Sequence, residues 1–260
     1  MDLGLRGRAA FVAASSKGMG LAIAQHFAAE GADVGMCARD ATTLESAAAS
    51  VRAAGVRVVA VPTDLSDAAQ VIAAVERTAS ELGRLDALVV NAGGPPPGVF
   101  DTLDDDAWHA AVELTLMSAV RMIRAALPHL RRSDAPSILF VSSLTVRQPL
   151  LGLTLSNSIR LAVAGLAKSL TYELAPAVRV NTLLPGNIAT DRSIQLARAR
   201  AGAGRTAEDV MADTARAIPA GRYGTPDEFA RAAVFVSSPA AAYVNGATIP
   251  VDGGLITATL

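Results

Sequence analysis

A glycine-rich stretch near the N-terminus has the residue types of a phosphate-binding turn. Residues 13–20 read Ala-Ala-Ser-Ser-Lys-Gly-Met-Gly, between an apolar run that predicts a strand and a stretch that predicts a helix. Backbone amides at such a turn and helix N-terminus can hold a diphosphate, provided that small residues allow close approach. Taken alone, the pair Gly18 and Gly20 is equally compatible with a tight strand-to-helix turn that binds nothing.

The elements that must position this turn alternate along the chain. Short β-branched runs alternate with longer alanine-rich amphipathic stretches, which is typical of a parallel sheet covered by helices. Runs that are apolar on both faces suit strands buried between two helical layers. We therefore predict an α/β fold, a single doubly wound domain of the Rossmann type over residues 1–260, with about seven strands and helices on both faces. The predicted strands cover residues 9–14, 32–38, 56–61, 85–90, 137–141, 178–184 and 247–251.

Composition excludes several classes of protein. A chain of 260 residues with 51% hydrophobic residues and a net charge of -1 predicts a soluble globular protein, and it argues against disorder and nucleic-acid binding. No apolar run reaches membrane-spanning length or resembles a signal peptide. The only cysteine, Cys37, excludes an internal disulfide and a cysteine-rich metal site. The three histidines lack metal-ligand spacing, so no metal is expected, and the predicted location is cytoplasmic.

One region interrupts the alternation of strands and helices. Residues 191–217 are rich in Ala, Arg and Gly, and they predict two short helices without a strand. Because long insertions in compact domains are usually functional or disordered, we interpret this region as a lid over a substrate pocket. Its arginines, among them Arg192, could attract an anionic substrate, but a solvated helix face explains them as well and is the preferred interpretation.

Further motifs follow the turn in order through almost the whole chain. With the turn, they resemble the short-chain dehydrogenase/reductase family, whose members are Rossmann-fold oxidoreductases. The motifs are Asp64-Leu65, Asn91-Ala92-Gly93-Gly94, Ser142-Ser143, Val180-Asn181, Pro185 to Thr190, Gly221-Arg222, Pro226 to Glu228 and Gly246 to Gly254. The resemblance implies a nicotinamide cofactor bound by Ser15, Ser16, Lys17, Gly18, Met19, Gly20, Arg39, Asp64, Leu65, Asn91, Ala92, Gly93, Arg160, Pro185, Gly186, Ile188 and Thr190.

Charge near the second predicted strand bears on the choice of cofactor. Arg39 replaces the acidic residue that would bind an unmodified ribose 2'-hydroxyl, and Lys17 adds a second cation within the turn. Two cations favour a 2'-phosphate, so NADP is expected over NAD. Two alternatives stay open: both cations are solvated surface charges, or the carboxylate of Asp40 takes the ribose instead.

The predicted active site departs from the family. Ser143 ends a strand as the family's catalytic serine does. The helix residues 165–174 resemble the family's so closely that Ser156 and Arg160 take the positions of its Tyr-x-x-x-Lys pair. Four residues apart on one helix, these two side chains face the same way. Thr115 takes the position of an asparagine that supports a water relay, so the chain resembles a divergent branch of the family.

This replacement affects one chemical step, the proton transfer. A serine is a far weaker acid than a tyrosine, and an arginine cannot shuttle protons at neutral pH. Ser143 and Ser156 could still bind a carbonyl oxygen, and Arg160 could stabilise a developing alkoxide. A water or another side chain would then deliver the proton. Loss of general acid catalysis typically costs about two to four orders of magnitude in rate.

Three further residues carry open expectations. Arg147 is a candidate oxyanion clamp, or equally an exposed loop cation. Asn157 is interpreted first as a helix cap, and otherwise as a group that orients substrate or water. Ala14 stands where the family has a glycine, and we expect it to keep a negative φ to accommodate its methyl group.

The sequence thus predicts an NADP-dependent oxidoreductase that interconverts a small or medium carbonyl compound and its alcohol with an atypical Ser156/Arg160 site. The alternative is an NADP(H)-binding sensor, or an inactive assembly partner of the same fold, without redox turnover. The resemblance also implies self-association as a homotetramer, with a dimer as the other possibility, and neither a nucleic-acid nor a membrane partner.

Overall fold

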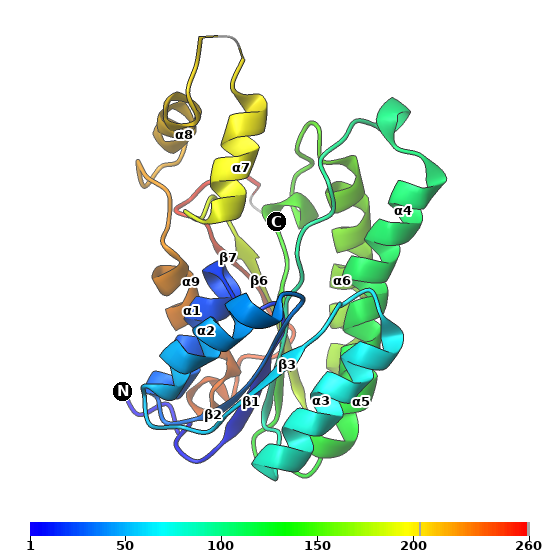
Figure 1. The fold of residues 1–260 in the computed structure, drawn as a ribbon, viewed down its shortest axis with the longest axis vertical. Coiled ribbons are helices and arrows are strands. Elements are labelled where there is room, and N and C mark those ends of the chain that lie inside the picture. Colours follow the sequence, from blue (N-terminus) through cyan, green and yellow to red (C-terminus); the bar gives the residue numbers. More distant parts are fainter. Residues whose placement is uncertain (203, 259–260) are drawn as a thin grey trace.

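The computed structural model describes residues 1–202 and 204–258, and Figure 1 shows their arrangement. Seven parallel strands form one sheet in the order β3-β2-β1-β4-β5-β6-β7. The strands are β1 (Ala9–Val12), β2 (Asp33–Ala38), β3 (Val58–Pro62), β4 (Ala87–Val90), β5 (Ser137–Val141), β6 (Arg179–Pro185) and β7 (Thr248–Val251). The predicted doubly wound sheet is confirmed, and each strand begins and ends within two residues of its predicted bounds. Ala203 of the predicted lid and the last two residues of the predicted domain lie outside the described residues.

Helices cover both faces of the sheet. In Figure 1, α1, α2 and α9 lie on one side of it, and α3, α5 and α6 lie on the other. The helices are α1 (Gly18–Ala29), α2 (Ala41–Arg52), α3 (Ala68–Leu82), α4 (Asp105–Val112), α5 (Ser118–Leu130), α6 (Thr154–Glu173), α7 (Asp191–Arg200), α8 (Ala207–Arg216) and α9 (Pro226–Ser237). Of the helices in the described part of the chain, none is both long and apolar enough to cross a membrane.

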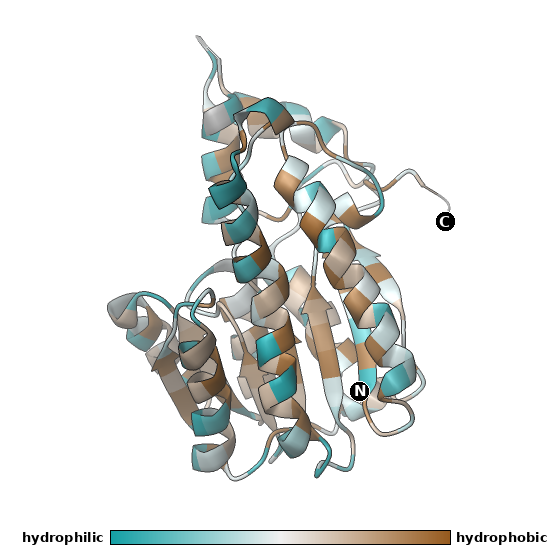
Figure 2. Cartoon of the chain, turned by 90° about the vertical axis from the view of Figure 1, so that its right-hand side faces the viewer, coloured by the Kyte–Doolittle hydropathy of each residue, from teal (hydrophilic) through white to brown (hydrophobic). Residues whose placement is uncertain are grey.

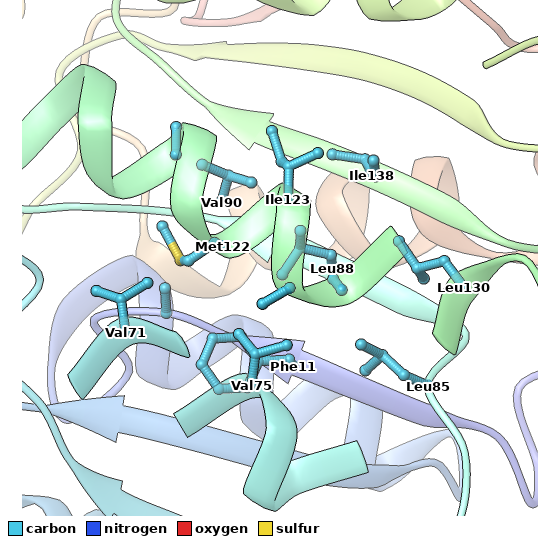
Figure 3. Packing of buried hydrophobic residues seen from close by; sticks show 14 of the residues in the cluster. Phe11, Val71, Val75, Leu85, Leu88, Val90, Met122, Ile123, Leu130 and Ile138 are labelled. Atoms are coloured by element: carbon cyan, nitrogen blue, oxygen red, sulfur yellow. The ribbon is translucent and has the colours of Figure 1, made fainter. Parts of the chain in front are cut away.

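Alternating strand residues build two hydrophobic cores. In β1, Phe11 packs with α3 and α5, whereas its neighbour Val12 packs with α1 and α9 on the opposite face. Figure 3 shows the first core, in which Val71 and Val75 of α3 and Met122 of α5 surround Phe11. The polar faces of the covering helices point away from the sheet (Figure 2). Burial of these apolar stripes holds the helices to the sheet.

Side-chain caps start three of the helices that flank the sheet, α2, α3 and α9. Asp40 and Asp67 accept hydrogen bonds from the first amides of α2 and α3, and Thr225 forms a capping box with Glu228 at α9. By contrast, α1 begins after Lys17 with no side-chain cap and no acidic residue in its first turn. The first amides of α1 therefore keep their donor capacity for another acceptor.

The order of the strands fixes where a ligand can enter. The chain runs outward from β1 to β3 and then returns to place β4 on the other side of β1. In open parallel sheets, ligands bind in the crevice that forms beyond the carboxyl ends of the strands at such a reversal. The glycine-rich turn follows β1 and Asn91 follows β4, so both lie at this crevice. The helices α7 and α8 stand beyond the same end of the sheet (Figure 1).

Candidate active site

The glycine-rich turn is held tightly between β2, β4 and α1. Ser15 is buried, its amide donates to the Cys37 carbonyl, and its hydroxyl accepts from the Cys37 amide at 3.2 Å. The Asn91 Nδ2 donates to the Ala13 carbonyl at 3.1 Å. A β-carbon on Gly20 would lie 2.3 Å from the Ala14 carbonyl oxygen, so only glycine fits there. The turn is thus preorganised beside the uncapped start of α1, which suits a diphosphate.

The expectation of a negative φ at Ala14 is wrong. Ala14 has φ +49°, in the left-handed region that favours glycine. The turn imposes this conformation, because Ser15 must reach β2 while the Ala13 and Ala14 carbonyls face Asn91. The methyl group is accommodated by packing against the core beside α3 and α5, and the backbone carries the strain.

Charged groups gather beyond the carboxyl end of β2. Lys17 and Arg39 are exposed. The Asp40 carboxylate accepts from the amide and hydroxyl of Thr43, and these bonds, with the charge of Lys17, hold the pKa of Asp40 below its usual value. Hydrogen bonds from Ser66, with the charge of Arg39, lower the pKa of Asp64. Asp40 is therefore engaged as the cap of α2, whereas Lys17 and Arg39 have no ion pair among the described residues.

The second predicted cofactor segment meets the first one directly. A β-carbon on Gly18, at the start of α1, would lie 3.3 Å from the Thr190 Cγ2, at the start of α7. Gly186 is packed more closely still, since a β-carbon there would approach the Asp252 Cα at 2.6 Å. The two segments therefore form one continuous wall of the crevice. The other predicted contacts also follow strands or open α1: Ser16, Met19, Leu65, Ala92, Gly93, Pro185 and Ile188.

A cluster of hydroxyl groups lies where β5 ends. Ser143 follows the strand, and its Oγ accepts from the Thr145 amide at 3.2 Å. The buried Thr145 brings its Oγ1 to 3.4 Å from the Ser156 Oγ on α6. Ser143 and Ser156 are half-buried, so a small molecule can reach them. Two predicted residues and one that the sequence analysis missed, Thr145, are thereby brought together.

Arg160 lies one turn further along α6 and has few partners. Its Nη1 donates to the Val141 carbonyl at 3.4 Å, and no carboxylate among the described residues pairs with it. Burial and the nearby Arg192 guanidinium lower the pKa of Arg160 to about 10. At neutral pH the group remains a cation, so it can stabilise negative charge but cannot supply a proton.

Thr115 lies in an irregular part of the helical segment before α5. Residues Glu113–Met117 form a single π-helical turn, of the kind that often occurs at functional sites. The Thr115 Oγ1 is buried, and it has no hydrogen-bond partner among residues 1–202 and 204–258. An unpartnered buried hydroxyl is costly unless another group, such as a water, satisfies it. Within the same residues, the Ser142 Oγ, next to the predicted catalytic serine, also has no partner.

Two further expectations are resolved by the loop between β5 and α6. Arg147 is exposed there, and its side chain contacts neither hydroxyl of the cluster through any hydrogen bond within the described ranges. Asn157 is not a helix cap, because α6 begins after Leu153. Its side-chain Oδ1 instead accepts from the Leu150 amide at 3.1 Å, and its Nδ2 donates to the Leu150 carbonyl at 2.9 Å. These two bonds fasten the loop to the helix. Counted over residues 1–202 and 204–258, no group of three His, Cys, Asp or Glu side chains could hold a metal ion.

The sequence left two interpretations for Arg192, attraction of an anionic substrate and a solvated helix face, with the second preferred. Arg192 is exposed, but it also makes a specific contact. It lies in the first turn of α7, and its Nη2 donates to the Pro95 carbonyl at 3.0 Å. Its charge contributes to the lowered pKa of Arg160. Residue spacing could not predict the contact of Thr145 with Ser156 or that of Arg192 with Pro95, because the two partners lie in different segments of the chain in each case.

Comparisons with known proteins agree with this geometry. A family model described as enoyl-(acyl carrier protein) reductase matches residues 13–256. A short-chain reductase, NovJ of Streptomyces niveus, is 35% identical over 246 residues, which are 94% of this chain and 92% of that protein.

Two solved structures are similar throughout. L-sorbose reductase from Gluconobacter frateurii, complexed with NADPH and L-sorbose, has a TM-score of 0.95 and 34% identity, covering 99% of this chain and 100% of that one. An NADPH-bound short chain oxidoreductase from Pseudomonas aeruginosa PAO1, described as containing an atypical catalytic center, has a TM-score of 0.88 and 36% identity, with 97% and 98% covered.

Proposed function

The chain belongs to the short-chain dehydrogenase/reductase family, and from that membership we propose that it is an NADP-dependent oxidoreductase that interconverts a carbonyl compound and its alcohol. One observation carries the proposal. The hydroxyl cluster of Ser143, Thr145 and Ser156 lies with Arg160 at the carboxyl end of β5, in the same crevice as the glycine-rich turn. Such an arrangement suits binding of a carbonyl oxygen beside a nicotinamide.

NADP would be held along the crevice from the turn to the start of α7. The uncapped amides of α1 would bind the diphosphate, and Lys17 with Arg39 would bind the 2'-phosphate. The close packing of Gly20 on the Ala14 carbonyl supports the proposal, because it fixes the turn beside the uncapped start of α1. When bound, this cofactor supplies or accepts the hydride. The NADPH complexes of two similar reductases support the assignment.

The residues at the end of β5 would bind and polarise the carbonyl. The hydroxyls of Ser143 and Ser156 would donate to its oxygen, and the cationic Arg160 would stabilise the negative charge that develops there. These groups would keep their protons while they bind the carbonyl oxygen. A proton would leave the protein only after an alkoxide has formed. The proposed site thus relies on electrostatic stabilisation more than on general acid catalysis.

Proton delivery would follow through hydroxyl groups. Ser156 would give its proton to the alkoxide and recover one from Thr145, whose Oγ1 lies 3.4 Å away. A serine is a weak acid, so it can protonate only a strongly basic oxygen, and the step would be slower than with a tyrosine. A water at the unpartnered Thr115 hydroxyl would connect the site to solvent. The similar Pseudomonas oxidoreductase is described as containing an atypical catalytic center, which supports the proposal of a non-standard site in a protein of this fold.

A second candidate function is an NADP(H)-binding sensor or an inactive assembly partner. One observation favours it: the described side chains of the hydroxyl cluster include no tyrosine, histidine or carboxylate that could titrate near neutral pH. This candidate predicts cofactor binding without turnover.

A combined binding and turnover experiment separates the two candidates. NADPH and NADH are titrated by fluorescence, and cofactor absorbance is then followed with panels of ketones, aldehydes and alcohols. The oxidoreductase proposal predicts turnover that falls about a hundredfold in Ser156→Ala. The control is Ser158→Ala, which removes an exposed hydroxyl from the same helix. Tight NADPH binding with no turnover on any panel would favour the sensor.

Replacement of Arg39 tests the choice of cofactor. We expect Arg39→Ser to raise the Kd for NADPH about tenfold and to leave the Kd for NADH nearly unchanged, because one charge-assisted contact to the 2'-phosphate is lost. The control is Arg52→Ser, in which an exposed arginine at the end of α2 is removed. Equal effects on both cofactors would contradict the assignment of NADP.

We also propose self-association as a homotetramer. Exposed apolar side chains on α6, Leu161 at 54% and Tyr172 at 74%, support an interface there, and the exposed Phe235 and Tyr243 near β7 support a second one. Light scattering on the purified protein tests the proposal, and a monomer at micromolar concentration would refute it.

A further inference from the structure

Two arginine side chains converge on one point in the crevice. If Gly94 carried a β-carbon, that atom would lie 3.7 Å from the Arg192 Nη2 and 3.9 Å from the Arg160 Nη2. Arg160 comes from α6 and Arg192 from the first turn of α7, so two elements far apart in the sequence bring two cations to the same side of the loop after β4. We call Arg160 and Arg192 the arginine pair.

The arginine pair lacks the partner that its charge requires. Throughout the part of the chain that the structure describes, neither guanidinium forms an ion pair with a carboxylate. Each donates only to a backbone carbonyl, Arg192 to Pro95 and Arg160 to Val141. Two like charges that face each other repel, and partial burial strengthens the repulsion. An anion between them would remove this cost.

The location of Arg192 strengthens the argument. The N-terminus of a helix carries partial positive charge, so a cation in its first turn is unfavourable and an anion is favourable. Arg192 occupies that turn of α7, and its exposed side chain donates to the Pro95 carbonyl at the edge of the crevice. Arg198, further along the same helix, is also exposed, but no such contact to the loop after β4 holds it within the described ranges. Arg192 is therefore held toward the crevice by a specific contact.

We propose that the arginine pair binds a carboxylate of the substrate, so that the protein acts on short oxo acids and the corresponding hydroxy acids. This inference rests on the proposed function, because it assumes a carbonyl bound at Ser143 and Ser156. Guanidinium groups bind carboxylates through two parallel hydrogen bonds, which fixes orientation as well as affinity.

Helix spacing places the two substrate-binding groups on one side of α6. Ser156 and Arg160 are one helical turn apart, so their side chains face the same way. A carboxylate at the arginine pair and a carbonyl at Ser156 can therefore belong to one short molecule. Short 2-oxo and 3-oxo acids are the proposed substrate class. Arg192 is exposed to solvent, so such a small anion can enter the pair directly.

Matched neutral and anionic substrates test the proposal by turnover. Pyruvate and acetoacetate are compared with their methyl esters, with NADPH, in the native protein, in Arg192→Gln and in the control Arg198→Gln. We expect the native protein and the control to prefer an acid over its ester at least about tenfold in kcat/KM, which corresponds to one charge-assisted contact. In Arg192→Gln the preference should fall below about threefold, through a higher KM for the acid. A native protein that prefers the esters, or a variant that keeps the preference for the acid, would overturn the proposal.

A binding measurement keeps the inference separate from the proposed function. The NADPH-loaded protein is titrated calorimetrically with malonate and with the neutral malonamide. Selective binding of malonate that is lost in Arg192→Gln supports the pair as a carboxylate site even if no oxo acid is turned over, in which case only the oxidoreductase proposal fails. The diphosphate of the cofactor is the other anion within reach. An Arg192→Gln variant that binds NADPH about tenfold more weakly, yet still prefers malonate, would assign the pair to the cofactor and overturn the inference.

Discussion

Ala14 carries a strained backbone at the entrance of the phosphate-binding turn. Its φ of +49° is a conformation that costs an L-residue roughly 1–2 kcal/mol. The strain persists because Asn91 holds the carbonyls of Ala13 and Ala14, and because α1 passes too close at Gly20 for the turn to relax. The strained backbone is therefore part of the fixed shape of the turn for which we propose diphosphate binding.

The variant Ala14→Gly should be more stable than the native protein. We expect the free energy of unfolding to rise by about 0.5–1 kcal/mol, because relief of the strain exceeds the added entropy of a glycine in the unfolded chain. Urea denaturation without cofactor measures the change. The control Ala13→Gly, at a buried neighbour without positive φ, should lower stability. Destabilisation of Ala14→Gly would show that its methyl packing outweighs the strain.

Thr145 is the residue through which the proposed proton path can be examined. Replacement by valine keeps the shape but removes the hydroxyl beside Ser156, so kcat should fall about tenfold while the Kd for NADPH stays unchanged. Thr145→Ser retains the hydroxyl and should restore most of kcat. Because a buried hydroxyl is removed, thermal unfolding of each variant is measured in parallel. Equal kcat values in the valine and serine variants would exclude Thr145 from proton delivery.

At the scale of elements, α6 carries the two proposed site residues, Ser156 and Arg160, and fastens the loop that precedes the helix. Asn157 ties Leu150 to the helix, and the loop is further joined to the segment after β4, where the Gly98 amide donates to the Gly152 carbonyl at 2.8 Å. The residues that follow β4 and β5 thus form one connected wall of the crevice. The hydroxyl cluster keeps its geometry because this wall is anchored on α6.

Replacement of Asn157 by leucine should detach the loop around Leu150 from α6. Two hydrogen bonds to the Leu150 backbone are lost, which should lower the free energy of unfolding by about 1–3 kcal/mol. Limited proteolysis should then cut within residues 147–153 faster than in the native protein. Asn157→Asp retains the acceptor and should give an intermediate rate. Unchanged proteolysis in the leucine variant would mean that the loop is held by other contacts.

At the scale of the whole molecule, a carboxylate network closes the end of the sheet opposite the crevice. Asp86 is buried before β4, and it accepts from the Ala9 amide at 2.8 Å and from Arg84 at 2.7 Å. Burial opposes its charge, but the hydrogen bonds from Arg84 and Ser133 prevail and lower its pKa. The neighbouring Asp134 is exposed, and its bond to Arg8 lowers its pKa to about 2. The network joins the starts of β1 and β4 to the turn before β5.

These lowered pKa values predict how stability depends on pH. Carboxylates with depressed pKa stabilise the folded state fully above their ordinary value of about 4, and this contribution is lost as pH falls through the folded pKa, which is about 2 for Asp134. Because the pKa of Asp86 is also lowered, Asp86→Asn should lower the free energy of unfolding by about 2 kcal/mol at pH 7 and weaken its dependence on pH below about 4. Denaturation at several pH values measures both effects, with Asp101→Asn, an exposed carboxylate, as the control. If the free energy of unfolding of Asp86→Asn depends on pH as in the native protein, the Asp86 carboxylate is not a source of that dependence.

Local patterns were sufficient for the sheet and for most of the cofactor crevice. Strands that are apolar on both faces and amphipathic helices each encode their burial in the order of residues, so all seven strands were predicted within two residues of their bounds. Ser156 and Arg160 share a helix, and their common orientation followed from spacing alone. The π-helical turn around Thr115 left no such pattern.

The sequence by itself determined the doubly wound fold, the position of the glycine-rich turn after the first strand, and the common helix of Ser156 and Arg160, because each depends on residues close together along the chain. Only the tertiary structure decided that Ala14 adopts positive φ, that Asn157 fastens a loop, and that Thr145 lies beside Ser156. The approach of Arg192 to Arg160 was decided in the same way. These contacts join loops and helices that follow different strands, and their geometry is set by how the helices pack on the sheet rather than by any local period.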